Sequence, residues 1–515
     1  MYPVEQRSAV PAVPRVDLSA ESYAQVRGVL ARGGYSGADV LRYLGVEAIP
    51  DVFEGGFFET VSRTVDTPLA ALTQLFLIGR GVELGRAEAL LGNEFLKACY
   101  AQGIAFAHES SGLLYAAVTI EPSLSGSEGV WLVSDRVIPV PEAGLPGFAE
   151  AVYPTVTPSA QLFLRLLPRR ECGRFFEACA GCGPAAMVAG RFADEVHAGD
   201  IDRRAVAFCA YNARLNDVGG FRAIEGSYYS NTDGAYDLIA AHPPYMPIDG
   251  AAEVFYSGGI DGTVLLRELI SQLPGKLKPG GLFYAVAMIP ESDAIAVEAR
   301  VREWLGEDAG DFDVFFFPLH TRSLIEVAYE ATAKVGGGSA AASQYRRKLL
   351  AMGHREFHFG ALILRFHEGP EPTIQVRRKL SPRTTWQEIL WCVDWDTGRK
   401  DAEQNAAFAN AAVKASEDLE VVITHRAGSS GLEPRRFQAI TRYPFEMESE
   451  IQGWMAVLLG QCDGSRSVLE IFASAKEQGM IHPETPVAEF IRLLSKFVSG
   501  GFLESSICPL PLARG

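Results

Sequence analysis

Between residues 151 and 366, short apolar runs alternate with stretches of helical periodicity, and this alternation constrains the fold more than any other feature of the sequence. Two of the separating stretches, 204–216 and 263–274, have apolar residues at helical spacing. Repeated strand–helix units predict a parallel sheet with helices on both faces, because parallel strands need a crossover connection. The predicted strands lie at residues 174–179, 195–200, 221–226, 236–242 and 281–289.

Two further apolar runs, 311–320 and 357–366, predict additional strands of the same α/β domain. An insertion at about 323–355 separates them and contains the glycine-rich stretch 334–343 and a basic helical stretch at 344–352. A glycine-rich connection of this length beside a sheet edge predicts a flexible segment that could act as a lid.

The length of 515 residues predicts roughly three or four domains. Residues 1–150 start with helices capped by Ser19 and Ser36 and end in strand-like runs at 113–122 and 129–136. This pattern predicts a winged-helix-like α+β module. The alternative interpretation is a domain that only packs against the neighbouring domain. The three predicted domains are 1–150, 151–366 and 367–515.

The C-terminal region 367–515 begins with a tryptophan-rich stretch, Trp386 to Trp395, followed by a predicted helix at 401–416 and a predicted strand at 420–427. The tail at about 445–505 has apolar patterns for helix, turn, helix, helix and a closing strand. We predict a winged-helix-like module at 445–505. The alternative is a dimerisation or packing unit, and in the first of these cases the protein would form a homodimer.

Composition excludes several classes of protein. The formal net charge of −16 disfavours binding to duplex nucleic acid, and no apolar run reaches the roughly 18 residues of a membrane span. The N-terminal prolines do not suit a signal peptide. Eight scattered cysteines predict a reducing compartment rather than a disulfide framework. We therefore expect a cytoplasmic protein that does not enter membranes.

The predicted strand at 174–179 leads into a glycine turn with features of a nucleotide-binding loop. Glu177 closes the strand, Gly181 and Gly183 lie in the turn, and a helix starts near Pro184. Glycine is needed where backbone approaches a ligand closely, and a helix start offers free N–H groups. Asp200 ends the next strand 23 residues later, close to the spacing of about 20 expected for an acid that holds ribose hydroxyls.

The fourth predicted strand stops at His242-Pro243-Pro244-Tyr245. Two prolines fix a rigid loop with defined carbonyl directions, and Tyr245 adds an aromatic face where the strand meets the ligand crevice. A dinucleotide dehydrogenase has no use for such a loop. The combination of glycine turn, acidic strand end and double-proline loop resembles the class I S-adenosylmethionine-dependent methyltransferases. Within them it is most similar to the branch that includes release-factor glutamine methyltransferases and ribosomal RNA methyltransferases.

The resemblance implies a Rossmann-like methyltransferase sheet over about 151–366, with S-adenosylmethionine as cofactor. It implies that the cofactor site contains the turn, the acidic strand end and a loop after the third strand, and that the double-proline loop contributes to catalysis. The implied cofactor-binding residues are Glu177, Ala178, Gly181, Gly183, Asp200, Ile201, Ser227, Tyr228 and His242, and the implied catalytic residues are His242, Pro243 and Tyr245.

Two residues depart from the pattern of this branch. Cys179 stands where the first glycine of the turn is usual, so the backbone there needs either a negative φ or tolerance of a small side chain. His242 stands where Asn or Asp is usual. The histidine can act as a general base, can replace Asn as a hydrogen-bond acceptor, or can pack against the turn.

The sequence does not identify the methyl acceptor. A small metabolite or a peptide is the first expectation, and RNA or a ribosomal or translation protein is the alternative. A non-catalytic cofactor-binding scaffold is an alternative of another class. The C-terminal tail weakly resembles PqqD-like winged helices that bind leader peptides.

No metal is expected from the sequence. Cys179 and Cys182 have a C-x-x-C spacing, but no second pair follows at a matching distance. His354 and His358 are four residues apart without an acidic ligand motif, and the second lies in a predicted strand.

Overall fold

The computed structural model describes residues 13–48, 61, 64–108, 110–123, 129–136, 151–248, 257–369, 372–428 and 431–511. The chain divides into two compact units. The first comprises residues Met1–Ile289 and Ile325–Leu349, and the second comprises Pro290–Leu324 and Leu350–Gly515. The division at 150 and 366 expected from the sequence stays a prediction.

The first unit begins with helices and short antiparallel sheets. Ser19 caps α1 (Ala20–Arg32) and Ser36 caps α2 (Gly37–Leu44), as predicted. β4 (Val118–Pro122) pairs antiparallel with β5 (Trp131–Asp135). The run expected at 113–122 is divided, because its first part forms β3 in a separate sheet of the order β1-β3-β2. The remaining elements are α4 (Pro68–Leu72), the π-helix η2 (Thr73–Ile78), β1 (Val82–Glu83), α5 (Leu84–Leu91), α6 (Asn93–Gln102), β2 (Ala105–His108) and β3 (Leu113–Ala116). The winged-helix assignment of this region stays a prediction.

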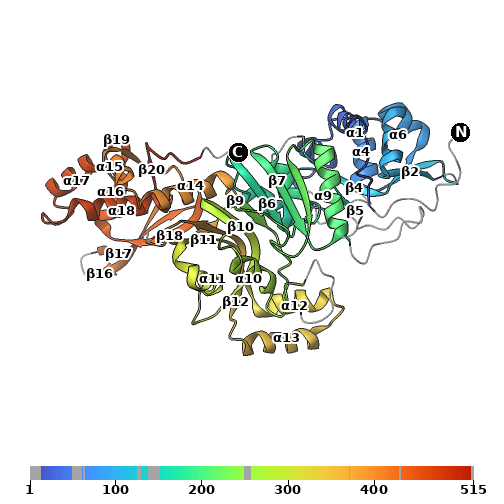
Figure 1. Ribbon diagram of the computed structural model, residues 1–515. Helices are drawn as coiled ribbons and strands as arrows, with labels where there is room; N and C mark the ends of the chain where they lie inside the picture. The colour runs from blue at the N-terminus through green and yellow to red at the C-terminus, as the bar shows by residue number, and fades with distance from the viewer. Residues whose placement is uncertain are drawn as a thin grey trace. The chain divides into compact units, whose positions relative to one another are not determined.

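The predicted parallel sheet is present in the first unit (Figure 1). Its strands have the order β10-β9-β6-β7-β8, and every neighbouring pair is parallel. The order reverses beside β6, which is where an open α/β sheet places its ligand crevice. The strands are β6 (Cys172–Ala178), β7 (Ala193–Asp200), β8 (Phe221–Glu225), β9 (Tyr236–Ala241) and β10 (Leu277–Glu291), and the helices between them are α8 (Pro184–Ala189), α9 (Arg203–Asn216) and α10 (Val264–Ser271).

Helix α9 joins this sheet to the N-terminal elements (Figure 1). The Asn212 side chain accepts from the Val133 N–H and donates to the Val133 carbonyl, and Asn216 does the same with Trp131. The two amides therefore satisfy backbone groups of β5 as a neighbouring strand would. Asn212 also donates to the Cys182 carbonyl at 2.8 Å. The contact of α9 with β5, which we call the Asn212 clamp, therefore extends to the glycine turn.

The predicted insertion is largely helical. It forms α12 (Leu324–Lys334) and α13 (Ser339–Ala351), and the glycines at 336–338 connect the two helices. Tyr345 of α13 is buried, and its hydroxyl lies within hydrogen-bond distance of the backbone carbonyls of Pro247 and Ile260. The insertion is thus attached to the loop that follows β9.

The second unit contains the two predicted strands, β11 (Phe312–Ser323) and β12 (Glu356–Phe366), which pair antiparallel. β13 (Gln375–Arg377) pairs parallel with β11. Helix α11 (Val297–Leu305) and the 3-10 helix η4 (Gly306–Asp311) precede β11, and β10 ends in this unit at Glu291.

The C-terminal part of the second unit has two small sheets, with orders β14-β18-β17-β16 and β19-β15-β20. The predicted helix at 401–416 is too long: α15 (Ala402–Asn410) ends early because β15 (Ala412–Ala415) pairs with β19 and β20. The winged-helix assignment stays a prediction. The elements are β14 (Lys379–Leu380), α14 (Trp386–Gly398), α15, β15, β16 (Glu420–Gly428), β17 (Gly431–Thr441), β18 (Phe445–Ile451), α16 (Gly453–Gly460), β19 (Asp463–Ser467), α17 (Val468–Glu477), α18 (Val487–Ser499) and β20 (Leu503–Ser505).

All eight cysteines are free thiols. Among the helices that the structure describes, none has the length and apolarity that a bilayer crossing requires.

Candidate active site

The candidate site lies at the carboxyl ends of three adjacent parallel strands. In the register of the sheet, Ala178 at the end of β6 pairs with Gly199 of β7 and with Ala241 of β9. The residues that follow these ends are therefore neighbours across one edge of the sheet. The sequence predicts that the glycine turn, the acidic strand end and the double-proline loop lie at one site. The strand register brings these three segments to the same edge of the sheet.

The turn after β6 contains three left-handed residues. Cys179, Gly181 and Gly183 have φ values of 54°, 55° and 77°. A negative φ at Cys179 was one of two expected ways to accommodate this residue, and it is wrong. The backbone retains the conformation that a glycine would adopt, at a cost of about 1–2 kcal/mol for a residue with a Cβ. A Cβ built on Gly181 would meet nothing within 4 Å, so the turn leaves open space for a ligand there.

Glu177 caps the helix that follows the turn, a structural role that the sequence did not indicate. Its carboxylate oxygens accept from the N–H groups of Ala185 and Ala186, at 3.1 and 2.7 Å, and so cap the start of α8. Burial raises the pKa of this carboxyl to about 8, although the two N–H donors act in the opposite direction. A cationic ligand near this buried carboxyl would lower its pKa, because a nearby positive charge favours the ionised form.

Asp200 links the end of β7 to the turn. Its two carboxylate oxygens accept from the N–H groups of Gly181 and Asp202, both at 2.9 Å. Burial raises its pKa as well. Each oxygen retains a second lone pair for a ligand hydroxyl. The neighbouring Ile201 is 65% exposed, which provides an apolar surface for a flat ring beside the acid.

The loop after β8 lies at the same end of the sheet. The Gly226 N–H donates to the Asp200 carbonyl at 2.9 Å, and Ser227 and Tyr228 follow directly. Ser227 is exposed, whereas Tyr228 is partly buried and has a left-handed φ of 51°. Both predicted residues therefore lie within reach of the crevice edge.

His242 lies in an aromatic stack after β9. Its ring stacks on Phe163 of α7 (Pro158–Leu166) at 5.3 Å between centroids, and Phe163 stacks in turn on Tyr284. Tyr245 lies 5.9 Å from the His242 ring centroid. The Nε2 atom of His242 is buried and has no hydrogen-bond partner among the described residues. Burial lowers the pKa of His242 to about 4, so the imidazole is neutral at pH 7.

Glycines support the double-proline loop from behind. A Cβ on Gly262 would lie 2.3 Å from the Tyr245 carbonyl oxygen, and one on Gly258 would lie 2.8 Å from the Pro244 carbonyl oxygen. The Gly258 N–H also donates to the Met246 carbonyl. Only residues without a side chain fit this close approach, which explains the glycine pair at these positions.

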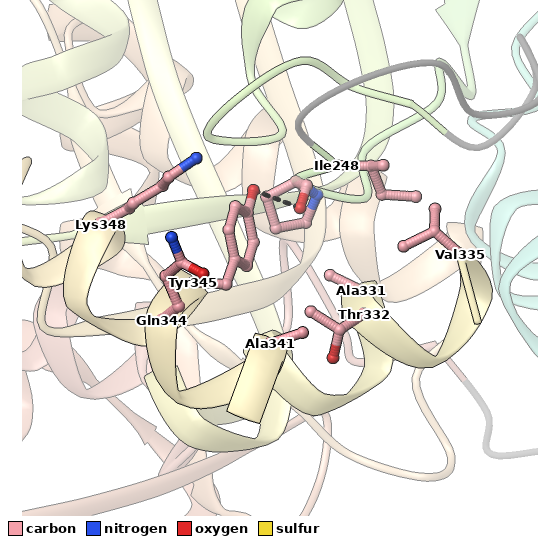
Figure 2. A pocket seen from close by; sticks show the side chains of 9 residues that line it. Ile248, Ala331, Thr332, Val335, Ala341, Gln344, Tyr345 and Lys348 are labelled. Carbon is pink, nitrogen blue, oxygen red and sulfur yellow. Dashed lines mark hydrogen bonds between the residues drawn. The ribbon is translucent and has the colours of Figure 1, made fainter. Parts of the chain in front are cut away.

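A cavity of about 160 Å³ lies beside the loop, between the loop and the insertion (Figure 2). Pro247 and Ile248 line it on the loop side, and Thr332, Gln344 and Lys348 line it on the helix side. Its lining residue Pro247 is two positions after Tyr245 in the sequence.

Three features support a fit to S-adenosylmethionine. The space above Gly181 is open, Glu177 and Asp200 offer carboxylate oxygens to an ammonium group and to hydroxyls, and Ile201 exposes an apolar surface. The hydroxyl of Thr157 accepts from the Ala160 N–H and so caps the start of α7.

Sequence reasoning missed several residues of the site. Phe163 and Tyr284 hold His242, Tyr345 holds the double-proline loop, and Asn212 holds the turn. An aromatic residue in an apolar helix or strand gives no signal of such a role. The two asparagines at helical spacing on an otherwise apolar face of α9 were a usable signal.

Comparison with known proteins gives a family match. Residues 153–298 match the family described as methyltransferase small domain. This match agrees with the resemblance to S-adenosylmethionine-dependent methyltransferases, whereas the domain bounds at 151 and 366 stay a prediction. The matched segment spans the turn, Asp200 and the double-proline loop.

Two curated relatives are also described as methyltransferases. A putative protein N5-glutamine methyltransferase of Methanocaldococcus jannaschii is 36% identical over 89 residues, which are 16% of this chain and 45% of that protein. A release factor glutamine methyltransferase of Deinococcus radiodurans is 28% identical over 160 residues, covering 28% of this chain and 56% of that protein. The chain thus spans about half the length of these relatives.

Among solved structures, the YcgJ protein of Bacillus subtilis is similar, with a TM-score of 0.27 and 15% identity. The alignment covers 41% of this chain and 98% of that one.

Proposed function

We propose that this chain, in which residues 153–298 form a methyltransferase domain, uses S-adenosylmethionine to methylate a protein or peptide acceptor. The observation that carries the proposal is the convergence of Glu177, Asp200 and His242 at adjacent strand ends within the matched segment. The named relatives methylate glutamine in proteins, by their descriptions, which favours a polypeptide over a small metabolite.

Each part of the crevice has a proposed partner on the cofactor. Glu177 and the open turn at Gly181 would hold the amino-acid end, and Asp200 would accept from the ribose hydroxyls. Ile201 would cover one face of the adenine, with Ser227 and Tyr228 at its edge. When bound, the cofactor supplies an electrophilic methyl group on a sulfonium that is already a good leaving group.

The double-proline loop would position the acceptor. The Pro243 carbonyl and the unpartnered Nε2 of His242 can accept hydrogen bonds from a planar amino or amide group. Tyr245 would cover the other side of that group. Orientation of this kind can supply up to about 7–11 kcal/mol of the barrier, so covalent assistance is not required.

His242 is proposed as a neutral hydrogen-bonding group rather than as a general base. A group with a pKa of about 4 is a poor match to proton abstraction near pH 7. An amide or amine acceptor needs little basic assistance, because its proton can leave to solvent after the methyl group is transferred. The low pKa therefore supports the acceptor role among the three that the sequence left open.

The test has two stages. Isothermal titration of the full chain with S-adenosylmethionine and S-adenosylhomocysteine should give saturable binding of both, and absence of binding would contradict the proposal. Transfer of a labelled methyl group to a library of peptides with Gln, Asn, Lys or N-terminal amines should then identify the acceptor class. Parallel reactions with RNA and with a small-molecule extract complete the assay. Label found only in these would contradict the polypeptide acceptor, and binding without any transfer would favour a cofactor-binding scaffold.

A further inference from the structure

A second cluster of ligating side chains lies in the second unit, apart from every residue used above. Glu291 is the last residue of β10, and Glu356 is the first residue of β12. The Arg355 N–H donates to the Glu291 carbonyl at 2.9 Å, which places the two strand ends side by side. His358 lies two residues after Glu356 on the same strand and therefore faces the same side.

The spacing of the three side chains suits a small cation. Nε2 of His358 is 3.3 Å from Oε1 of Glu356 and 3.6 Å from Oε2 of Glu291. One ligand atom from each residue lies within 4.8 Å of the other two. Ligands at about 2.0–2.2 Å from a tetrahedral zinc ion are about 3.3–3.6 Å from one another. The two carboxylate oxygens lie within 4.8 Å of each other and would have to reach this spacing to bind such an ion.

The histidine supplies an independent sign of a ligand. His358 is 6% exposed, and its Nε2 makes no hydrogen bond among the described residues although it faces both carboxylates. Its other ring nitrogen, Nδ1, lies 3.0 Å from the hydroxyl of Thr321. A hydrogen bond on the far nitrogen is what orients a histidine that ligates metal.

The charge of the cluster also calls for a cation. Arg377 bonds both Glu291 and Glu298, so one positive charge is shared between two acids. With Glu356, these groups bring three negative charges and one positive charge together. The acidic side chains therefore outnumber Arg377, and a divalent cation would balance the excess negative charge.

We propose that Glu291, Glu356 and His358 bind a divalent transition-metal ion of the zinc type. One nitrogen and two carboxylate ligands leave a fourth position for water, and the side chain of Glu356 is 40% exposed, so that position is open to solvent. The ion would fasten the end of β10 to the start of β12. The proposal departs from the sequence expectation of no metal, because residue 291 is separated by 65 positions from residue 356. It does not depend on the proposed methyltransferase activity.

The experiment uses the full chain after removal of metal with a chelator. Titration with Zn²⁺ and, separately, with Co²⁺ should give one saturable site. Glu356→Gln should weaken binding at least about tenfold, and His358→Ala should weaken it further. His320→Gln changes an exposed histidine of β11 outside the cluster and should bind like the wild type. Glu356 is the primary position because its exposed side chain can be replaced without disturbing a core.

Two readouts distinguish this site from binding of the ion elsewhere on the chain. The visible spectrum of bound Co²⁺ should indicate nitrogen and oxygen ligands, and a thiolate charge-transfer band would place the ion on cysteines and overturn the assignment. Absence of saturable binding, or equal affinity in Glu356→Gln and wild type, would also overturn it.

Discussion

The carboxylate of Asp200 provides the sharpest test of the cofactor site. In Asp200→Asn, one of the two oxygens becomes an NH₂ group, which faces an N–H donor of Gly181 or Asp202 where an acceptor is needed. A hydrogen bond to a charged group is worth about 1.5–3 kcal/mol, and the ribose loses a charged acceptor as well. We expect the Kd for S-adenosylmethionine to rise by about 10- to 150-fold.

Isothermal titration with three ligands measures this effect. S-adenosylhomocysteine and methylthioadenosine should weaken alongside S-adenosylmethionine in Asp200→Asn, because all three contain the ribose. Glu177→Gln should weaken the two amino-acid-bearing ligands but not methylthioadenosine. Asp194→Asn, on the exposed amino end of the same strand, is the matched control and should leave each Kd within about twofold. Unchanged affinity in Asp200→Asn would refute the placement of the ribose.

Three further predictions follow from the site. His242→Asn should retain methyl transfer and its pH profile, because an imidazole with a pKa of about 4 contributes no inflection between pH 6 and 7; an inflection there that vanishes in the variant would restore the general-base role. Cys179→Gly should raise the free energy of unfolding of the first unit by up to about 1 kcal/mol, because relief of the left-handed φ outweighs the greater chain entropy of glycine in the unfolded state. A lower melting temperature in this variant would argue against backbone strain at Cys179. Tyr345→Phe removes the hydroxyl that donates to the Pro247 and Ile260 carbonyls, so KM for the acceptor should rise about 2- to 12-fold while the Kd for the cofactor stays unchanged. Equal changes in KM and in cofactor Kd would contradict a role of the insertion in positioning the acceptor.

Local signals were enough to predict the sheet and the ends of its strands. The apolar runs and the acid at Asp200 follow from rules that act over a few residues, and β6, β7 and β9 end within one residue of the positions that the sequence indicates. The same holds for the caps at Ser19 and Ser36. Short-range chemistry therefore indicates the strand ends that the sheet register brings together.

Contacts between distant segments were not predictable in this way. Phe163 stacks on both His242 and Tyr284, and Asn212 bonds to β5. These contacts join residues that are 79 to 121 positions apart. The low pKa of His242 arises from such burial and not from its sequence neighbours. The early end of α15 at Asn410 has the same origin, because pairing of β15 with β19 and β20 outweighs the helical preference of alanine.

A crystal structure of the chain with S-adenosylhomocysteine tests the central claim most directly. Our account predicts adenosine across the carboxyl ends of β6, β7 and β8, with its ribose hydroxyls on Asp200 and its sulfur facing the loop from His242 to Tyr245. Density for the ligand at any other place, or side chains filling the space above Gly181, would contradict it.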